Sequence, residues 1–549
     1  MDTQRLILFV VFSFSLLLLW EAWQKETRPP PPAATATTPG SVPTPSALGE
    51  SAQAKGAPVP PTAAAAPAEG GPRELLQVTT DLIKADIDTR GGDIVYLELL
   101  QQKDARDETK NFVLFGPEHR YAAQSGLIGS GLPNHRTPFR AQGKAFALAP
   151  GQDKVEVRLE ASAPQGVKVT KVLTFYRGSY RIDVAEEIAN SGSAPLATDA
   201  YFQVARDGRS AGGDPYMTQT YTGAAVYTDR DKFQKVTFDD IAKGKVAYPK
   251  TADNGWIAMI QHYFVAALLP PDKVQREFYT RKLDGDLYSI GVIMPAGPVA
   301  PGASARIEVA LYAGPQDQDH LQSVAPGLQL VVDYGWLTVI AAPLFWVLKL
   351  FHGWLGNWGL AIILLTVVIK LIFFPLSAAS YRSMAKMKLV TPRLMKLREQ
   401  YGDDKVKMNQ AMMDLYKTEK INPLGGCLPI VVQIPVFISL YWVLFESVEL
   451  RHAPFYLWIK DLAAPDPWYV LPTLMMVSMI IQTRMNPTPP DPVQAKVMMI
   501  MPLVFGVMFY FFPSGLVLYW FVNNILSILQ QWQITRMIGG DKAAGGAKR

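Results

Sequence analysis

The sequence predicts a multi-pass α-helical membrane protein that carries one large β domain outside the cytoplasm. Three observations support this prediction. The chain of 549 residues has a polar middle part between an apolar N-terminal segment and an apolar C-terminal third. Strand-like alternation of apolar and polar residues marks the middle part, whereas long apolar runs mark the C-terminal third. Lysine and arginine gather in the loops on one side of these runs, as is typical of the cytoplasmic face.

The first element is an apolar run, residues 6–20, which follows Arg5. A cleaved signal peptide and a retained anchor both begin this way. No small-residue cleavage site follows the run closely, because the nearest candidate, residues 34–36, lies too far downstream. We therefore interpret residues 1–24 as a transmembrane anchor. Residues 25–72 are rich in Pro, Ala, Thr and Gly, which predicts a disordered linker because such a composition cannot bury a core.

Residues 73–330 have the pattern of a β-sandwich. Short runs that are either alternating or fully apolar follow one another, and Gly and Pro separate them. About 250 residues are enough for one large sandwich domain. The clearest predicted strands are residues 155–159, 168–175, 256–260, 264–269 and 306–312.

The chain becomes hydrophobic after this domain. Residues 331–354 are apolar but include Pro343 and Lys349, which favours an amphipathic helix lying in the membrane interface. Residues 355–536 contain five further apolar runs, so the N-terminal anchor brings the expected number of transmembrane helices to six. Several runs are short for a hydrocarbon core of about 30 Å, which favours local thinning of the bilayer or packing between helices. The predicted spans are residues 356–376, 426–446, 468–483, 497–512 and 515–532.

Basic residues set the orientation of these spans. They outnumber the acidic residues in the loop between the second and third spans, and they flank the loop between the fourth and fifth. They also occur in the tail of residues 537–549, at Lys542, Lys548 and Arg549. All three regions lie on one side if both termini are cytoplasmic. The linker and the β domain then lie across the membrane, which suggests the inner membrane and periplasm of a Gram-negative bacterium.

The largest cytoplasmic loop, residues 378–421, has the pattern of a helical hairpin. Its apolar residues recur at three- and four-residue steps, Gly402 ends the first helix, and Asp403 or Asp404 can cap the second. The methionines among these residues could either fill the seam or offer an adaptable surface to apolar partners. The predicted seam residues are Met387, Val390, Leu394, Leu397, Tyr401, Met408, Met412 and Leu415.

The first helix of this hairpin is strongly basic. A solvated charged surface is one interpretation. The other is a surface that recruits ribosomes or targeting factors, or that docks on anionic lipid headgroups, through contacts with phosphates. The cations concerned are Arg382, Lys386, Lys388, Arg393, Lys396 and Arg398.

Lys370 interrupts an apolar run, and Thr366 lies one helical turn before it. Placing a cation at such a depth costs about 2.5–3.5 kcal/mol, so the side chain usually faces a wet cavity or a partner. The alternative is that Lys370 snorkels toward the nearer membrane surface. Other predicted spans also carry polar side chains, with an i, i+4, i+8 stripe in the last one. These residues are Gln433, Ser478, Gln482, Tyr519, Trp520, Asn523, Asn524 and Ser527.

Each polar residue alone is more often a hydrogen-bonding contact between helices. If the spans converge, however, the residues line one hydrated groove that opens to the cytoplasm and to lipid. Such a groove could accept the polar tail of an inserting peptide and lower the cost of carrying unsatisfied polar groups into hydrocarbon. Burial of the apolar helix in lipid would drive the process without a nucleotide.

Two long motifs resemble signatures of the YidC membrane protein insertases. Residues 422–429, Asn-Pro-Leu-Gly-Gly-Cys-Leu-Pro, with Gln433-Ile-Pro435, are similar to the third-span signature. Residues 512–519, Phe-Pro-Ser-Gly-Leu-Val-Leu-Tyr, are similar to the last-span signature, and the layout fits the Gram-negative branch. The resemblance implies insertion and chaperoning of nascent membrane proteins, alone or with the Sec translocon. It also implies a periplasmic β-supersandwich and a core of five transmembrane helices.

The chain departs from the family pattern at two groove positions. Lys370 stands where the family commonly has arginine, so the charge remains but the bidentate fork is lost. Trp520 stands where a tyrosine is often implicated in substrate contact, so the hydroxyl is lost. The resemblance implies a substrate-contacting role for Thr366, Lys370 and Trp520. The predicted groove set is completed by Gln433, Tyr519, Asn523 and Ser527.

Two other classes of protein were weighed against an insertase. A transporter or channel predicts internal symmetry and Gly-interrupted half-helices, and the sequence has no such symmetry. A sugar-binding or sugar-modifying protein would need only one anchor, not six spans. The sequence has no nucleotide, zinc-protease or serine-hydrolase motif, and the histidines have no metal-ligand spacing. We therefore expect neither enzymatic activity nor a cofactor or metal.

Overall fold

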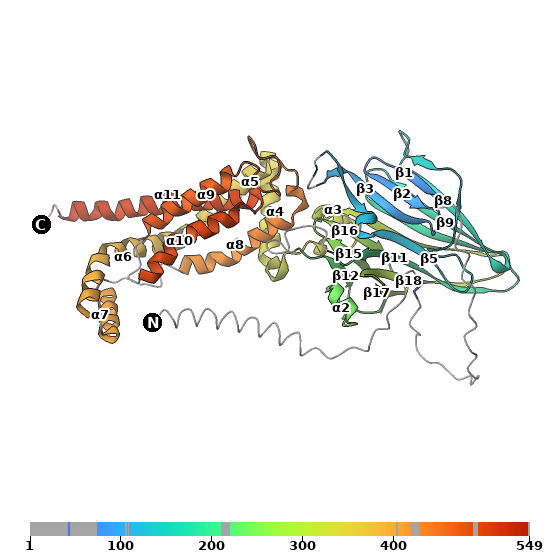
Figure 1. The fold of residues 1–549 in the computed structure, drawn as a ribbon, viewed down its shortest axis with the longest axis horizontal. Coiled ribbons are helices and arrows are strands. Elements are labelled where there is room, and N and C mark those ends of the chain that lie inside the picture. Colours follow the sequence, from blue (N-terminus) through green and yellow to red (C-terminus); the bar gives the residue numbers. More distant parts are fainter. Residues whose placement is uncertain are drawn as a thin grey trace. The chain divides into compact units, whose positions relative to one another are not determined.

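The computed structural model describes residues 42–43, 74–104, 107, 109–209, 220–401, 404–419, 428–486 and 492–546. The predicted anchor of residues 1–24 and the basic tail from residue 547 onward lie outside the described residues. The chain divides into two compact units, which are described separately: a β unit up to Gly314 that also includes residues 325–328, and a helical unit made of residues 315–324 and 329–549 (Figure 1).

The β unit contains two large sheets, and most of their strands pair antiparallel. Short turns punctuated by Gly connect many strands, as the sequence pattern predicts. The ten-stranded sheet has the order β14 (Thr251–Ala252), β17 (Arg276–Leu283), β18 (Leu287–Val299), β11 (Leu196–Asp207), β5 (Ala122–Ile128), β3 (Asp93–Lys103), β2 (Ile83–Asp88), β1 (Leu75–Thr79) and β7 (Ala145–Ala147), with β4 (Asn111–Phe115) paired to β3. The nine-stranded sheet has the order β13 (Lys232–Val236), β12 (Gly223–Thr228), β15 (Trp256–Gln261), β16 (Phe264–Leu269), β19 (Ser304–Pro315), β10 (Arg181–Asn190), β9 (Val167–Tyr176), β8 (Lys154–Ala163) and β6 (Arg140–Ala141).

The prediction of a β-sandwich is confirmed, and each of the five segments chosen from the sequence falls within a strand. β8 alternates as expected: Val157 and Leu159 are buried, whereas Glu156 and Arg158 point outward. β15 and β16 are buried along almost their whole length, because a fully apolar run can face protein on both sides.

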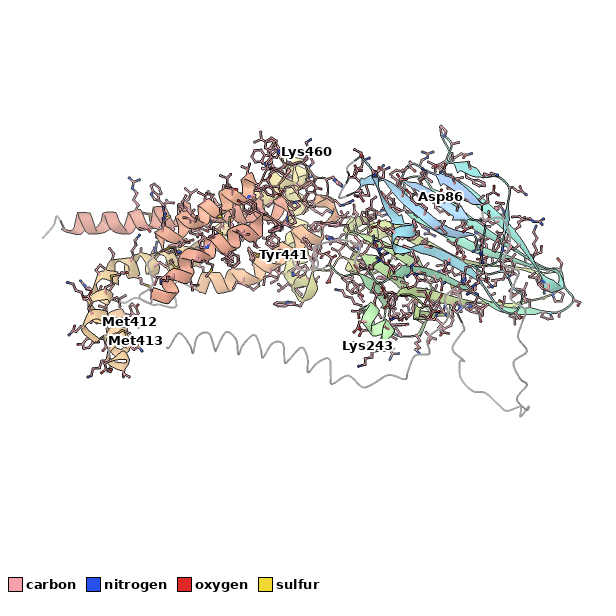
Figure 2. The ribbon with its side chains drawn as sticks, viewed as in Figure 1. Asp86, Lys243, Met412, Met413, Tyr441 and Lys460 are labelled. Atoms are coloured by element: carbon pink, nitrogen blue, oxygen red, sulfur yellow. The ribbon has the colours of Figure 1, made fainter. Side chains whose placement is uncertain are left out.

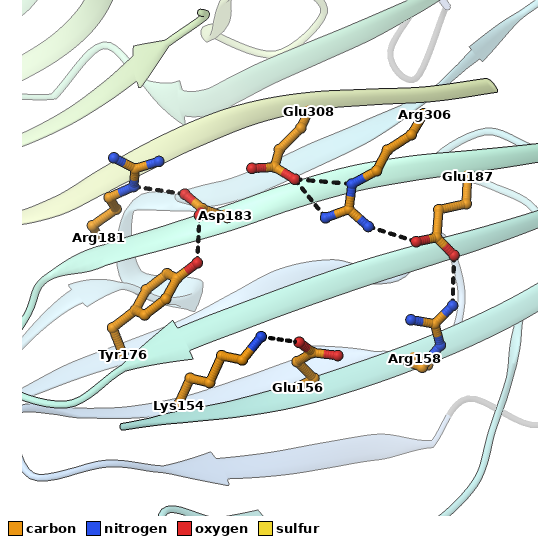
Figure 3. A network of polar contacts seen from close by, with 9 residues as sticks. All are labelled: Lys154, Glu156, Arg158, Tyr176, Arg181, Asp183, Glu187, Arg306 and Glu308. Atoms are coloured by element: carbon orange, nitrogen blue, oxygen red, sulfur yellow. Dashed lines mark hydrogen bonds and ion pairs between the residues drawn. The ribbon is translucent and has the colours of Figure 1, made fainter. Parts of the chain in front are cut away.

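Part of the nine-stranded sheet presents a ladder of charged side chains across β8, β10 and β19 (Figure 3). Arg158 and Arg306 each place a nitrogen 2.5 Å from a carboxylate oxygen of Glu187. Arg306 also pairs with Glu308 at 2.5 Å. Cross-strand pairs of opposite charge stabilise a register modestly, so this ladder favours the observed pairing over a one-residue slip.

Charged groups are also buried inside the β unit. Lys171 on β9 and Glu186 on β10 have fully buried side chains, with 3.5 Å between the ammonium and a carboxylate oxygen. The Lys171 ammonium also donates to the carbonyl oxygens of Gly91 and Ser125, while the Ser125 hydroxyl donates to Glu186 at 2.8 Å. Such hydrogen bonds are needed because an unpaired charge in an apolar interior is very costly.

Asp93 on β3 belongs to the same interior. Burial raises the pKa of its carboxyl group to about 7, although the Lys171 ammonium and a hydrogen bond from Gln124 oppose that rise. The folded state therefore holds a proton on Asp93 that the unfolded chain releases at much lower pH. This contribution to stability is fully present below the unfolded pKa and is lost as pH rises through about 7.

We predict that Asp93→Asn flattens the dependence of β-unit stability on pH. Between about pH 4 and pH 7, the free energy of unfolding of the wild type should fall relative to the variant by about 1.4 kcal/mol per pH unit. Hydrogen exchange of strands β3 and β10 in the full-length protein measures this difference. Parallel pH profiles for the two proteins would show that Asp93 does not retain a proton when folded.

Two residues of the predicted disordered linker are among those described. Pro43 is buried, and Val42 packs against the cluster of Tyr201, Tyr279 and Ile293 on the ten-stranded sheet. This contact brings one point of the 25–72 segment onto the β unit. The rest of that segment lies outside the described residues, and its disorder stays a prediction.

The helical unit follows the order of apolar runs expected from the sequence. Asn357 caps α5 by accepting a hydrogen bond from the Leu360 N–H at 3.0 Å, and Gly356 ends α4 with a φ of 64°. The helices are α3 (Gln318–Val324), α4 (Thr338–Leu355), α5 (Trp358–Ile372), α6 (Phe374–Tyr401), α7 (Lys405–Thr418), α8 (Leu428–Glu446), α9 (Val470–Met485), α10 (Pro492–Phe509) and α11 (Ser514–Gly546).

The described helices leave the number of membrane spans open. Gly335–Leu355 is long and apolar enough to cross a membrane. α5 and α6 together meet the same criterion but are bent by 67°, as in a broken span or a re-entrant loop. Val432–Glu446, Val470–Met485 and Ala495–Phe509 are apolar but shorter. The six-span count and the interfacial position of residues 331–354 therefore stay predictions.

α6 and α7 fold back on each other as a helical hairpin. α6 and α7 pack through Val390, Leu394 and Tyr416, and Met387 and Met412 adjoin this cluster. Asp404 caps α7 by accepting from the Lys407 N–H at 3.1 Å, whereas Gly402 and Asp403 lie outside the described residues. Met412 therefore packs in the seam between the two helices, whereas Met413 beside it is exposed (Figure 2). Tyr416 belongs to this cluster although it was not among the predicted seam residues.

Candidate functional site

Polar side chains from five helices line one groove in the helical unit, with a volume of about 380 Å³. The predicted residues Lys370, Gln433, Asn523 and Ser527 meet there, so α5, α8 and α11 converge as the groove hypothesis required. The lining contains no carboxylate among the described residues. Its remaining members are Ser377, Ser380, Tyr381, Met384, Ile434, Phe437, Gln482, Asn486 and Asn524.

Lys370 lies in the last turn of α5 and is only 5% exposed. Its ammonium donates a hydrogen bond of 2.8 Å to the Ser527 hydroxyl on α11. Within the described part of the chain, no carboxylate forms an ion pair with it. The interpretation of Lys370 as a groove residue thus agrees with this geometry, because its side chain points toward α11.

α11 contributes three side chains to the groove and forms hydrogen bonds with the helices around it. Asn524 donates to the Ser478 hydroxyl on α9 at 2.7 Å, and Gln531 donates to the Asn486 side chain at 3.0 Å. A weaker contact of 3.4 Å runs from Gln433 on α8 to the Asn523 side chain. One polar face of α11 is therefore bonded to α5, α8 and α9, which satisfies polar groups that hydrocarbon could not.

Three predicted site residues do not line the groove. Thr366 is buried, and its hydroxyl donates to the Ile362 carbonyl at 2.6 Å, inside its own helix. Tyr519 is buried, and its hydroxyl has no hydrogen-bond partner among the described residues. Trp520 is 8% exposed and stacks on Phe437 with 4.8 Å between ring centroids.

Trp520 belongs to an aromatic cluster behind the groove wall. Phe509 and Phe512 approach its ring edge-on at 4.3 and 5.8 Å. Phe437 links this cluster to the groove, because its ring contacts Trp520 and also lines the groove. The indole supports the wall of the groove through Phe437.

Sequence reasoning missed the contribution of α6. Ser377, Ser380, Tyr381 and Met384 all line the groove. The last three fall inside the predicted hairpin of residues 378–421, and Ser377 lies between that hairpin and the predicted span of residues 356–376. Their spacing of three and four residues was the available signal, since it places them on one face of a helix. The bend of 67° between α5 and α6 turns that face toward the groove, and sequence spacing alone does not give such an angle.

The hairpin cations lie on α6, away from its seam. Arg382, Lys386, Lys388 and Lys396 are exposed, and Arg393 pairs with Glu419 across the hairpin at 2.5 Å. Arg398 lies on the same helix, but its side chain is not described. The arrangement gives a basic surface that is available to a partner or to lipid.

Sequence comparisons decide the family. Residues 75–347 match the model for the YidC periplasmic domain, and residues 350–541 match the model for the 60Kd inner membrane protein. A membrane protein insertase YidC from Dechloromonas aromatica (strain RCB) is 59% identical, and the alignment covers 100% of both chains. A second relative with the same description, from Aromatoleum aromaticum, is 58% identical, and the alignment again covers 100% of both chains.

The chain belongs to the YidC family of membrane protein insertases. The resemblance read from the last-span and third-span motifs is thereby confirmed, as is the class of helical membrane protein with a periplasmic β-sandwich. A solved structure, described as an active YidC insertase with its first transmembrane domain resolved, is 19% identical to this chain. It matches with a TM-score of 0.39 over 83% of this chain and 93% of the other.

Proposed function

We propose that the chain is an inner-membrane insertase and chaperone, which works alone or with the Sec translocon on nascent membrane proteins. Full-length relatives that carry the name membrane protein insertase support this assignment. The observation that carries the mechanism is Lys370, a buried cation without a carboxylate partner among the described residues, which lines a polar groove between apolar helices. The groove opens to the cytoplasm and to lipid.

The groove lowers the barrier that a polar tail meets in hydrocarbon. Amide and hydroxyl groups on α8, α9 and α11 replace part of the water around the tail, and the Lys370 ammonium attracts an acidic residue on it. The following apolar helix then leaves sideways into lipid, where burial of its surface drives the step. No described side chain needs to change covalently, so the process is not enzymatic.

Site-specific photo-crosslinking tests the proposed path. Probes at positions 433 and 523, which both line the groove, should capture a stalled nascent membrane protein. A probe at Leu371, which is 64% exposed and outside the groove, is the matched control and should capture much less. Stronger capture at 371 than at both groove positions would place the path elsewhere.

A flux assay on the same proteoliposomes separates an insertase from a transporter or channel. Insertion of the nascent chain should proceed without release of a trapped small solute. Solute release that scales with the amount of protein, in the absence of insertion, would favour the transporter.

We predict that the basic surface of α6 recruits ribosomes or targeting factors. Replacing Lys386 and Lys388 together with glutamine should weaken co-sedimentation with translating ribosomes, and the remaining binding should depend less steeply on salt. The matched control removes Lys407 and Lys417, which pair with acids in or next to α7. An equal loss in both variants would indicate a general charge effect, and anionic vesicles in place of ribosomes test the lipid alternative.

A further inference from the structure

Ser527 contacts the Lys370 ammonium in the groove, and its hydroxyl also bonds to the backbone of its own helix. The hydroxyl donates to the Asn523 carbonyl, one turn back on α11, at 2.7 Å. Its proton is therefore committed to the backbone, and its lone pairs remain for acceptance. The Lys370 ammonium donates to this oxygen at 2.8 Å. A hydroxyl that already donates is a better acceptor, so the two bonds reinforce each other.

The ammonium needs such an anchor because a lysine side chain is long and flexible. It carries a point charge on four methylene groups, and it can snorkel toward water when nothing holds it. No other hydrogen bond to the Lys370 ammonium is present among the described residues. One N–H therefore points at Ser527, and the geometry leaves two N–H donors for a ligand in the groove.

We propose that Ser527 is a positioning residue: it fixes the Lys370 ammonium against α11, and thereby sets the preference of the groove for acidic tails. This proposal rests on the insertase function proposed above. Ser527 acts through Lys370 and does not itself have to touch the inserting chain. The ammonium held in this way presents its charge at one depth of the groove, where an aspartate or glutamate of the tail can reach it.

Ser439 provides a matched control. It lies on α8, it is fully buried, and its hydroxyl donates to the Pro435 carbonyl one turn back at 2.8 Å. It shares the buried, backbone-bonded state of Ser527, but among the described residues it has no hydrogen bond with Lys370 and does not line the groove. Ser439→Ala and Ser527→Ala thus make the same chemical change, and only the second releases the ammonium.

The experiment compares two nascent chains that differ only in their translocated tail, one acidic and one with the amides in place of the acids. Full-length protein in proteoliposomes inserts both, and the readout is the ratio of the two insertion efficiencies. Ser527→Ala should lower the acidic-to-neutral ratio by about tenfold, which corresponds to losing one charge-assisted hydrogen bond. Ser527→Thr, which keeps the hydroxyl, should restore the ratio, and Ser439→Ala should leave it unchanged.

Lys370→Glu in the same assay separates the proposal from the function on which it rests. If Lys370→Glu lowers the ratio and Ser527→Ala does not, Ser527 has no positioning role although the groove cation matters. If Lys370→Glu also leaves the ratio unchanged, the electrostatic mechanism of insertion itself is wrong. If Ser527→Ala and Ser439→Ala both lower the insertion efficiency of the acidic and the neutral chain equally, the defect is structural and the positioning role is overturned.

Discussion

Lys370→Glu should nearly abolish insertion of substrates with acidic tails, while Lys370→Arg should retain it. Two unit charges about 4 Å apart interact by about 4 kcal/mol at an effective permittivity of 20, and the reversal turns this attraction into repulsion. The groove contains no other charged side chain among its described lining, so nothing there compensates. Depletion of the native protein in cells, followed by measurement of insertion for each variant, gives the result.

Substrates with neutral tails are the control for this prediction. In Lys370→Glu, the insertion efficiency of neutral-tailed substrates should fall much less than that of acidic-tailed ones, because only the charge-dependent part of the path is altered. If the Lys370→Glu variant inserts both classes of substrate as well as the wild type does, Lys370 has no electrostatic role in the mechanism. If Lys370→Ala is tolerated, hydration of the groove contributes more than its charge.

Lys171→Met should destabilise the β unit by about 3–5 kcal/mol, because it leaves the fully buried Glu186 carboxylate without its cation. The Gly91 and Ser125 carbonyl oxygens lose their donor at the same time. Chemical unfolding of the full-length protein, followed by hydrogen exchange of β9 and β10, measures the loss. Adding Glu186→Gln should recover a large part of it, since the buried charge is then removed.

An exposed ion pair calibrates this effect. Asp239 on α2 (Phe238–Ala242) pairs with Lys243, the residue that follows this helix, at a separation of 2.6 Å. The two side chains are 68% and 57% exposed, and Lys243 is labelled in Figure 2. Lys243→Met should cost less than about 1 kcal/mol, because water already screens the pair. A loss at Lys171 as small as at Lys243 would mean that the interior of the sandwich readily admits water or relaxes around the carboxylate.

Much of the fold follows from local pattern. The two-residue alternation in residues 155–159 specifies a strand with one buried face, and the apolar runs of residues 256–269 specify strands covered on both faces. The caps at Asp404 and Asn357 act over three residues, so the sequence contains everything needed to locate a helix start. Polar residues buried in a sandwich have no such local pattern, and Lys171 looks like any surface lysine along β9.

The groove was predictable only in part. Lys370, Gln433, Asn523 and Ser527 stand out because polar groups are rare in apolar helices. Thr366 and Trp520 were assigned to the same surface by helical spacing and by resemblance, but they pack behind it. A helical wheel gives the face of a residue and not what covers that face, which depends on neighbours from other helices.

The sequence by itself determined the class of the protein, the family motifs, the strand and helix segments and the basic character of the hairpin. These features depend on composition and on contacts between residues close in the chain, where the backbone geometry is known in advance. Only the tertiary structure decided that α6 turns four side chains into the groove, that Ser527 accepts from Lys370, and that Glu186 lies beside Lys171. Each of these contacts joins separate elements, and its position depends on crossing angles, bends and strand order that local pattern does not encode.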